Sequence, residues 1–111
     1  MNFLAVCLSF AVIDASTILC GAEEVHILGI TCPGIQAPEG SKARDALERV
    51  LVGRRVELKR RSRDAEGHTM AKVFADGRDV ACQMVRAGIC RENESSGEYE
   101  DCRPIPWPPR R

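Results

Sequence analysis

The segment EGHTMAKVFADG, residues 66–77, carries the clearest structural pattern in the chain. Residues 69–74 are mostly apolar or β-branched and predict a strand, and residues 75–77 (ADG) predict a turn. Asp79 follows as a helix N-cap, and Gly88 is placed to end that helix. The residues expected to face the core between them are Val80, Met84 and Val85.

A second amphipathic helix is predicted upstream of this segment. A loop rich in proline and glycine spans residues 33–40, and Ser41 suits the N-cap that would follow it. Gly53 is expected to end the helix. The apolar positions recur at i, i+3, i+4, i+7 and i+8: Ala43, Ala46, Leu47, Val50 and Leu51.

The remaining apolar stretches predict strands. Residues 4–13, 17–20 and 25–30 are expected to form three strands before the first helix. Residues 56–58 alternate apolar and charged side chains, and a charged loop is expected after them, to about residue 67. The order of three strands, helix, two strands and helix predicts an α+β, mainly β fold. We expect a five-stranded OB-fold barrel with two or more flanking helices.

Length and composition narrow the class of protein. The chain has 111 residues, which suits one domain, and its formal net charge is zero, which argues against a globally basic nucleic-acid binder. Residues 3–13 are apolar but too short to span a membrane. We interpret them as a strand rather than a signal peptide, because no Lys or Arg precedes them.

The chain contains six cysteines, an even and high number that predicts disulfides in a secreted or periplasmic protein. They are Cys7, Cys20, Cys32, Cys82, Cys90 and Cys102. Spacing alone leaves the full connectivity open. We predict the pair Cys90 and Cys102, because these two residues flank one short polar loop.

The composition changes near residue 91. We expect residues 1–90 to form the domain and residues 91–111 to form an acidic, then proline-rich extension that packs on it or trails from it. One interpretation is a terminal segment lying on the surface. The alternative is a protein-binding proline motif around Trp107.

Three ordered phrases resemble the staphylococcal nuclease (thermonuclease) family. Residues 12–17, VIDAST, resemble its V-I-D-G-D-T, and residues 26–34, HILGITCPG, resemble R-L-L-G-I-D-A-P-E. Residues 66–77 resemble Y-G-R-x-L-A-x-V-F-x-D-G. The match runs in order over roughly residues 5–90. It implies an OB-fold and a calcium-dependent phosphodiesterase that acts on nucleic acid.

The resemblance also implies which groups such a reaction needs. Carboxylates hold calcium, a glutamate acts as general base, and two arginines bind the phosphate. All five positions differ in this chain: Ser16, His26, Thr31, Gly34 and His68. Asp14 survives, but in the family it looks structural. We therefore predict a degenerate member without bound calcium, another metal or another cofactor, which acts as a non-enzymatic binding or interaction module.

Two alternatives keep some chemistry in the old site. Residues 34–39, GIQAPE, also resemble G-I-D-A-P-E, and this register would supply Glu39 to a weak or altered phosphodiesterase. The fold should also bring His26 and His68 together. They could bind phosphate at low pH, act in acid–base chemistry or bind a transition metal with Cys32. We favour the interpretation that the two histidines are substitutions without a function of their own in a site that has lost its activity.

A third hypothesis concerns the basic run at residues 54–63. Arg60, Arg61 and Arg63 could bind a polyanion, either nucleic acid or an exopolysaccharide. The plainer interpretation is the solvated face of a strand and its loop, because Glu57 lies within the run.

Overall fold

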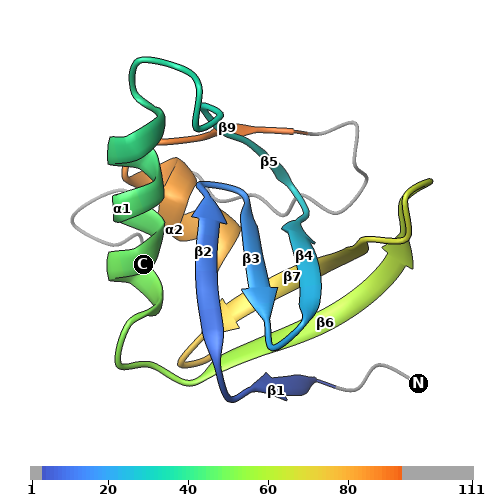
Figure 1. Cartoon of the computed structure of the whole chain (residues 1–111). Helices are drawn as coiled ribbons and strands as arrows, with labels where there is room; N and C mark the ends of the chain where they lie inside the picture. Colours follow the sequence, from blue (N-terminus) through green and yellow to red (C-terminus); the bar gives the residue numbers. More distant parts are fainter. Residues whose placement is uncertain (1–3, 94–111) are drawn as a thin grey trace, which may run out of the picture.

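The computed structural model describes residues 4–93, which form a curled, mainly β sheet with two flanking helices (Figure 1). The strands are β1 Ala5–Cys7, β2 Phe10–Asp14, β3 Thr17–Cys20, β4 Glu23–Ile27, β5 Ile30–Thr31, β6 Val56–Arg63, β7 Thr69–Ala75, β8 Arg78–Asp79 and β9 Arg91–Glu92. The helices are α1 Gly40–Leu51 and α2 Val80–Arg86. The predicted fold class, a small OB-type barrel with helices at its side, is confirmed.

The main sheet curls because its two outer strands are neighbours in the chain. The strand order is β1-β6-β7-β4-β3-β2, with β8 added to β7. β1 and β2 stand at opposite ends of this order, yet only Leu8 and Ser9 separate them in the sequence. The single first strand predicted for residues 4–13 is therefore broken in two. The Cys7–Cys20 disulfide joins β1 to β3 beside this break.

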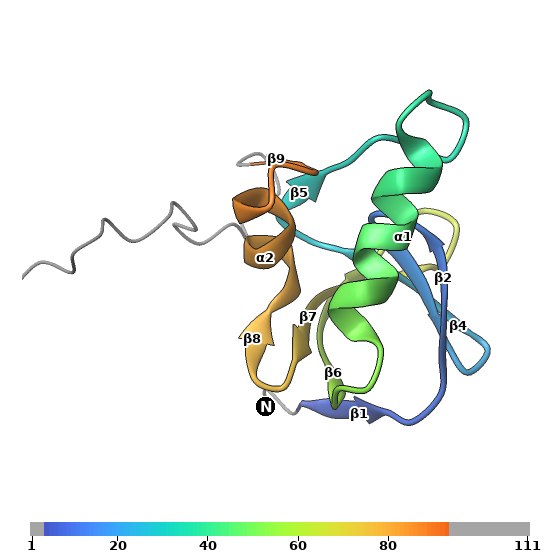
Figure 2. The same cartoon turned by 90° about the vertical axis from the view of Figure 1, so that its left-hand side faces the viewer.

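The two helices cover the sheet and complete the core (Figure 2). α1 packs against β2 and α2 against β7. As predicted, the Asp79 side chain caps α2, accepting a hydrogen bond from the Cys82 amide at 3.3 Å. Large core side chains that are fully buried include Ile18, Val25, Leu47, Leu51, Leu58, Val73 and Met84.

Helix α1 follows its apolar stripe but begins two residues earlier than predicted. Its N-cap is Glu39 rather than Ser41, and within residues 4–93 no side chain caps it. Gly40 is the first helical residue, where the chain passes very close to the preceding loop. A Cβ on Gly40 would lie 2.1 Å from the Gly34 carbonyl oxygen, so the site requires glycine.

Strand β6 is longer than predicted. It continues to Arg63, through residues that were expected to form a charged loop. The strand persists because its backbone pairs with β7 through to Arg63 opposite Thr69, with one irregularity between Arg60 and Ser62. Residues 60–63 are exposed, so their charges remain in water while their backbone groups are paired.

The predicted Cys90–Cys102 disulfide is wrong, because Cys90 is bonded to Cys32. The cause is a small antiparallel pairing of β5 with β9, in which Thr31 lies opposite Arg91. The adjacent cysteines therefore face each other, with a Cα–Cα distance of 4.4 Å. Cys102 and the proline-rich segment around Trp107 lie outside the described residues.

Candidate functional site

The two histidines predicted to lie close together do so. β4 pairs in parallel with β7, with Val25 opposite Thr69. His26 lies opposite Met70, which is two residues after His68, so the alternation of side chains places both rings on the same face of the sheet. The ring centroids of His26 and His68 are 5.1 Å apart. The predicted closeness of the two rings is confirmed.

A carboxylate from β4 joins the two rings. Glu24 lies two residues before His26, and the alternation of a strand places the two side chains on one face. Glu24 Oε2 is 2.9 Å from His26 Nε2 and 3.5 Å from His68 Nδ1. All three side chains are about one-third exposed. The group is thus accessible, yet held by paired strands.

The loop before β7 adds further carboxylates around His68. Asp64 Oδ1 accepts hydrogen bonds from the backbone amides of Glu66 and His68, each at 2.9 Å. These bonds, chiefly the one from His68, hold the pKa of Asp64 below its ordinary value. Asp64 Oδ2 and Glu66 Oε1 lie 3.4 and 3.8 Å from His68 Nδ1. That nitrogen is buried and has no hydrogen-bond partner among the described residues.

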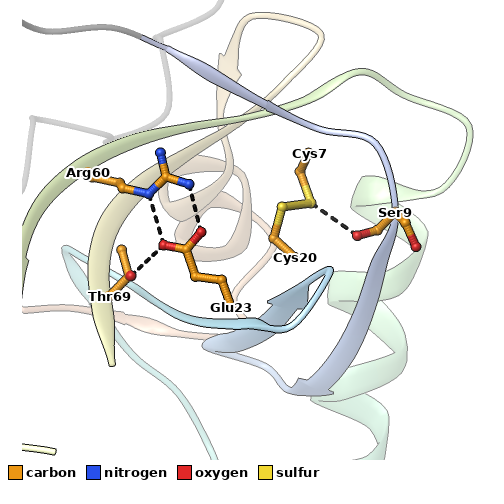
Figure 3. The surroundings of a disulfide bond; sticks show 6 residues. All are labelled: Cys7, Ser9, Cys20, Glu23, Arg60 and Thr69. Atoms are coloured by element: carbon orange, nitrogen blue, oxygen red, sulfur yellow. Dashed lines mark hydrogen bonds and ion pairs between the residues drawn. A yellow bond between two sulfur atoms is a disulfide. The ribbon is translucent and has the colours of Figure 1, made fainter. Parts of the chain in front are cut away.

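Glu23, Arg60 and Thr69 form a second polar group (Figure 3). Arg60 donates two hydrogen bonds to Glu23, from Nε at 2.8 Å and Nη2 at 2.6 Å, and the Thr69 hydroxyl donates a third at 2.5 Å. The Arg60 hydrogen bond is the largest cause that lowers the pKa of Glu23 to about 2. An open hollow of about 700 Å³ is lined by Glu23, Glu24, Arg60, Arg63 and His68, among others.

Among the other family positions, Ser16 lies next to β4, because its carbonyl oxygen accepts a hydrogen bond from the Ile27 amide at 2.8 Å. Asp14 Oδ1 accepts hydrogen bonds from the Ser16 amide at 2.9 Å and the Ser16 hydroxyl at 3.3 Å. Thr31 and Glu39 instead line a hollow of about 370 Å³, and the described residues lining it do not overlap with those around His68. Gly34 is exposed.

The basic residues predicted as polyanion contacts do gather in one place. Arg60, Arg61 and Arg63 are exposed and line a hollow of about 220 Å³ with Ser62 and Thr69. Arg60 is engaged by Glu23, and Arg63 donates to the Gly67 carbonyl at 3.3 Å. Part of their positive charge is therefore already compensated within the chain.

Sequence reasoning missed Glu24 and Asp64, and the alternative of a transition-metal site with Cys32 is wrong in its third ligand. Cys32 cannot supply a thiolate ligand, because its sulfur is bonded to Cys90. A usable signal for Glu24 was its position two residues from His26 on a predicted strand. Asp64 could not be placed so simply, because it reaches His68 only through the turn of its loop.

Comparisons with known proteins agree with the geometry. Residues 24–103, more than half of the chain, match the family model described as staphylococcal nuclease homologue. Among curated protein sequences, the comparison finds no match. Within residues 4–93, no helix is long and apolar enough to cross a membrane.

Proposed function

The chain belongs to the staphylococcal nuclease family, and we propose that it has lost the family's calcium-dependent phosphodiesterase activity and serves as a binding or interaction module. The observation that carries this proposal is the identity of the residues at the positions of the family's catalytic groups. At the positions matching the family's catalytic groups stand two neutral hydroxyls, a glycine and two imidazoles: Ser16, Thr31, Gly34, His26 and His68.

The residues present do not fit a calcium ion. Calcium prefers charged oxygen ligands, and the two matching positions offer only the hydroxyls of Ser16 and Thr31. The Ser16 hydroxyl is also hydrogen-bonded to Asp14. A dication placed there would lose the charge compensation that two carboxylates provide.

The positively charged phosphate contacts of the family are replaced here by histidines that lie next to carboxylates. The histidines stand where the family resemblance implies arginines, and carboxylates surround them. Glu24 and Asp64 lie within 3.5 Å of His68 Nδ1. A phosphate entering this group would meet two negative charges, which raises the free energy of binding.

The general base is also missing. Gly34 has no side chain that could accept a proton, and a positioned base is worth roughly 10²–10⁴ in rate. Each lost electrostatic contact to the transition state would remove a further factor of about 10²–10³. These factors multiply, so turnover by the family route should be negligible.

A weak or altered phosphodiesterase is the second candidate. It is favoured by one observation, namely that Glu39 and Thr31 line the same hollow together with Arg91. Calcium titration with a single-stranded DNA substrate separates the two proposals. We expect no metal-dependent cleavage. Cleavage that appears with calcium and is lost in Glu39→Gln would overturn the first proposal and support the second.

A polyanion is one partner that this binding module could take. The exposed Arg60, Arg61 and Arg63 line one hollow, and such contacts should weaken steeply with salt. Fluorescence anisotropy with single-stranded DNA and with an acidic polysaccharide tests this. We expect salt-sensitive binding that Arg61→Ala weakens, whereas Lys42→Ala on α1 leaves it unchanged. Salt-independent binding would exclude this mode.

The disulfides support a secreted or periplasmic location as part of the proposal. Cys7–Cys20 and Cys32–Cys90 persist in oxidising compartments and are rare in the cytosol. Thiol quantification on the denatured, unreduced protein isolated from its natural source would test this, since an oxidising location predicts that no free thiol is detected.

A further inference from the structure

Three metal-ligating atoms converge on one point beside β4 and β7. Glu24, His26 and His68 each offer one such atom, and the three atoms lie within 4.8 Å of one another. In a tetrahedral zinc site with bonds of about 2.0–2.1 Å, ligand atoms are roughly 3.3 Å apart. The two Glu24 distances, 2.9 and 3.5 Å, fall on either side of this value. The donor atoms therefore need only small adjustments to share an ion.

We propose that Glu24, His26 and His68 bind a transition-metal dication of the zinc class. Two imidazoles and one carboxylate suit such a borderline ion, whereas calcium prefers an all-oxygen shell. This site goes beyond the proposed function, because it uses residues other than those expected to hold calcium in the family. It also does not depend on whether the chain cleaves nucleic acid.

The state of His68 supports the site independently of the distances. Its Nδ1 is buried and lacks a hydrogen-bond partner among the described residues, although carboxylate oxygens lie 3.4–3.8 Å away. A buried polar atom in this condition raises the free energy of the folded state. A metal ion bound to Nδ1 would use its lone pair and would also neutralise the surrounding negative charge.

The fold holds the ligands in place before an ion arrives. Glu24 and His26 belong to β4, whose pairing with β7 continues in a 2.9 Å hydrogen bond from the Leu28 amide to the Ala71 carbonyl. Asp64 fixes the His68 backbone through Oδ1 and leaves Oδ2 3.4 Å from His68 Nδ1. Asp64 is thus a positioning residue for His68. The partial exposure of the side chains gives an ion an entry path.

Zinc titration by calorimetry tests the proposal on the full, oxidised chain after treatment with a chelator, at pH 7.5. We expect one zinc ion per chain. Removing a residue that only hydrogen-bonds to a metal ligand typically weakens metal affinity about 10–100-fold. Removing a ligand itself, in Glu24→Gln, His26→Asn or His68→Asn, should therefore weaken zinc affinity at least about tenfold. The control Glu48→Gln removes an exposed carboxylate on α1 and should bind like the wild type.

Cobalt(II) supplies a second readout that identifies the donors. Its visible spectrum should show low-symmetry coordination without a sulfur-to-metal charge-transfer band, since Cys32 and Cys90 form a disulfide. Circular dichroism in the presence of chelator checks that each variant is folded. If His68→Asn does not fold, the variants of His26 and Glu24, which are partly exposed, still test the site. Absence of saturable zinc binding would overturn the proposal. So would binding that all three ligand variants retain.

Discussion

Removing the charge of Glu23 should destabilise the fold in a pH-dependent way. In Glu23→Gln the side chain keeps its shape, but the bidentate ion pair with Arg60 and the charged hydrogen bond from Thr69 are lost (Figure 3). This pair connects β4 to β6 across β7, so it links strands that are far apart in the sequence.

The pKa of Glu23 sets the upper limit of the effect. Its pKa falls from 4.5 to about 2 in the folded state. A difference of one in pKa corresponds to about 1.4 kcal/mol, so the limit is about 3 kcal/mol. The Arg60 side chain is 48% exposed, and solvent screens such pairs, so we expect about 1–2 kcal/mol.

The direction of the pH dependence follows from the lowered pKa. The stabilisation is fully present above pH 4.5 and is lost as the pH falls towards 2, because the carboxylate must then be protonated. Urea unfolding of wild type and Glu23→Gln across this window isolates the contribution of one residue. Glu48→Gln serves as the control on an exposed helix face. A difference in unfolding free energy that is equal at pH 2 and pH 7 would refute the reasoning.

Further predictions concern covalent and steric constraints. A disulfide lowers the conformational entropy of the unfolded chain, and this effect grows with the length of the loop it closes. Replacing both cysteines of Cys7–Cys20 by alanine, with a sequence separation of 13, should cost about 3 kcal/mol of stability. The same change at Cys32–Cys90, with a separation of 58, should cost about 4 kcal/mol. Denaturant unfolding of both double variants measures this, and the reverse order would contradict it. Gly40→Ala should destabilise by roughly 1–3 kcal/mol, because the new Cβ would meet backbone atoms at 2.1–2.8 Å. An unchanged melting temperature would show that the loop can move aside.

Features set by local periodicity were predictable from the sequence. The stripe through Ala43, Leu47 and Leu51 gave helix α1, and Asp79 was identified as the cap of α2. The ordered phrases of the family resemblance implied a fold in which His26 lies close to His68, and the structure shows this. These features depend on residues close together in the chain or on motifs that the chain shares with the family.

The rest depends on contacts between distant residues. The extension of β6 to Arg63 arises from its pairing with β7, and a run of charges gives no local sign of it. The partner of Cys90 was set by the short β5–β9 pairing, which brings Cys32 opposite. Asp64 joined the histidines because its loop turns back on itself. Such arrangements follow from the assembled fold rather than from local pattern.

Our central proposal is that the five replaced positions by themselves abolish the family's phosphodiesterase activity in this chain. Cleavage of single-stranded DNA in saturating calcium should therefore be undetectable for the wild type and gained when the family groups are restored as Ser16→Asp, His26→Arg, Thr31→Asp, Gly34→Glu and His68→Arg. The glutamate introduced at position 34 has room for its side chain. Apart from the two neighbouring residues, no described atom lies within 4 Å of the position of its Cβ. The expected gain is at least about 10⁴-fold. Calcium-dependent cleavage by the wild type at a comparable rate would contradict the account.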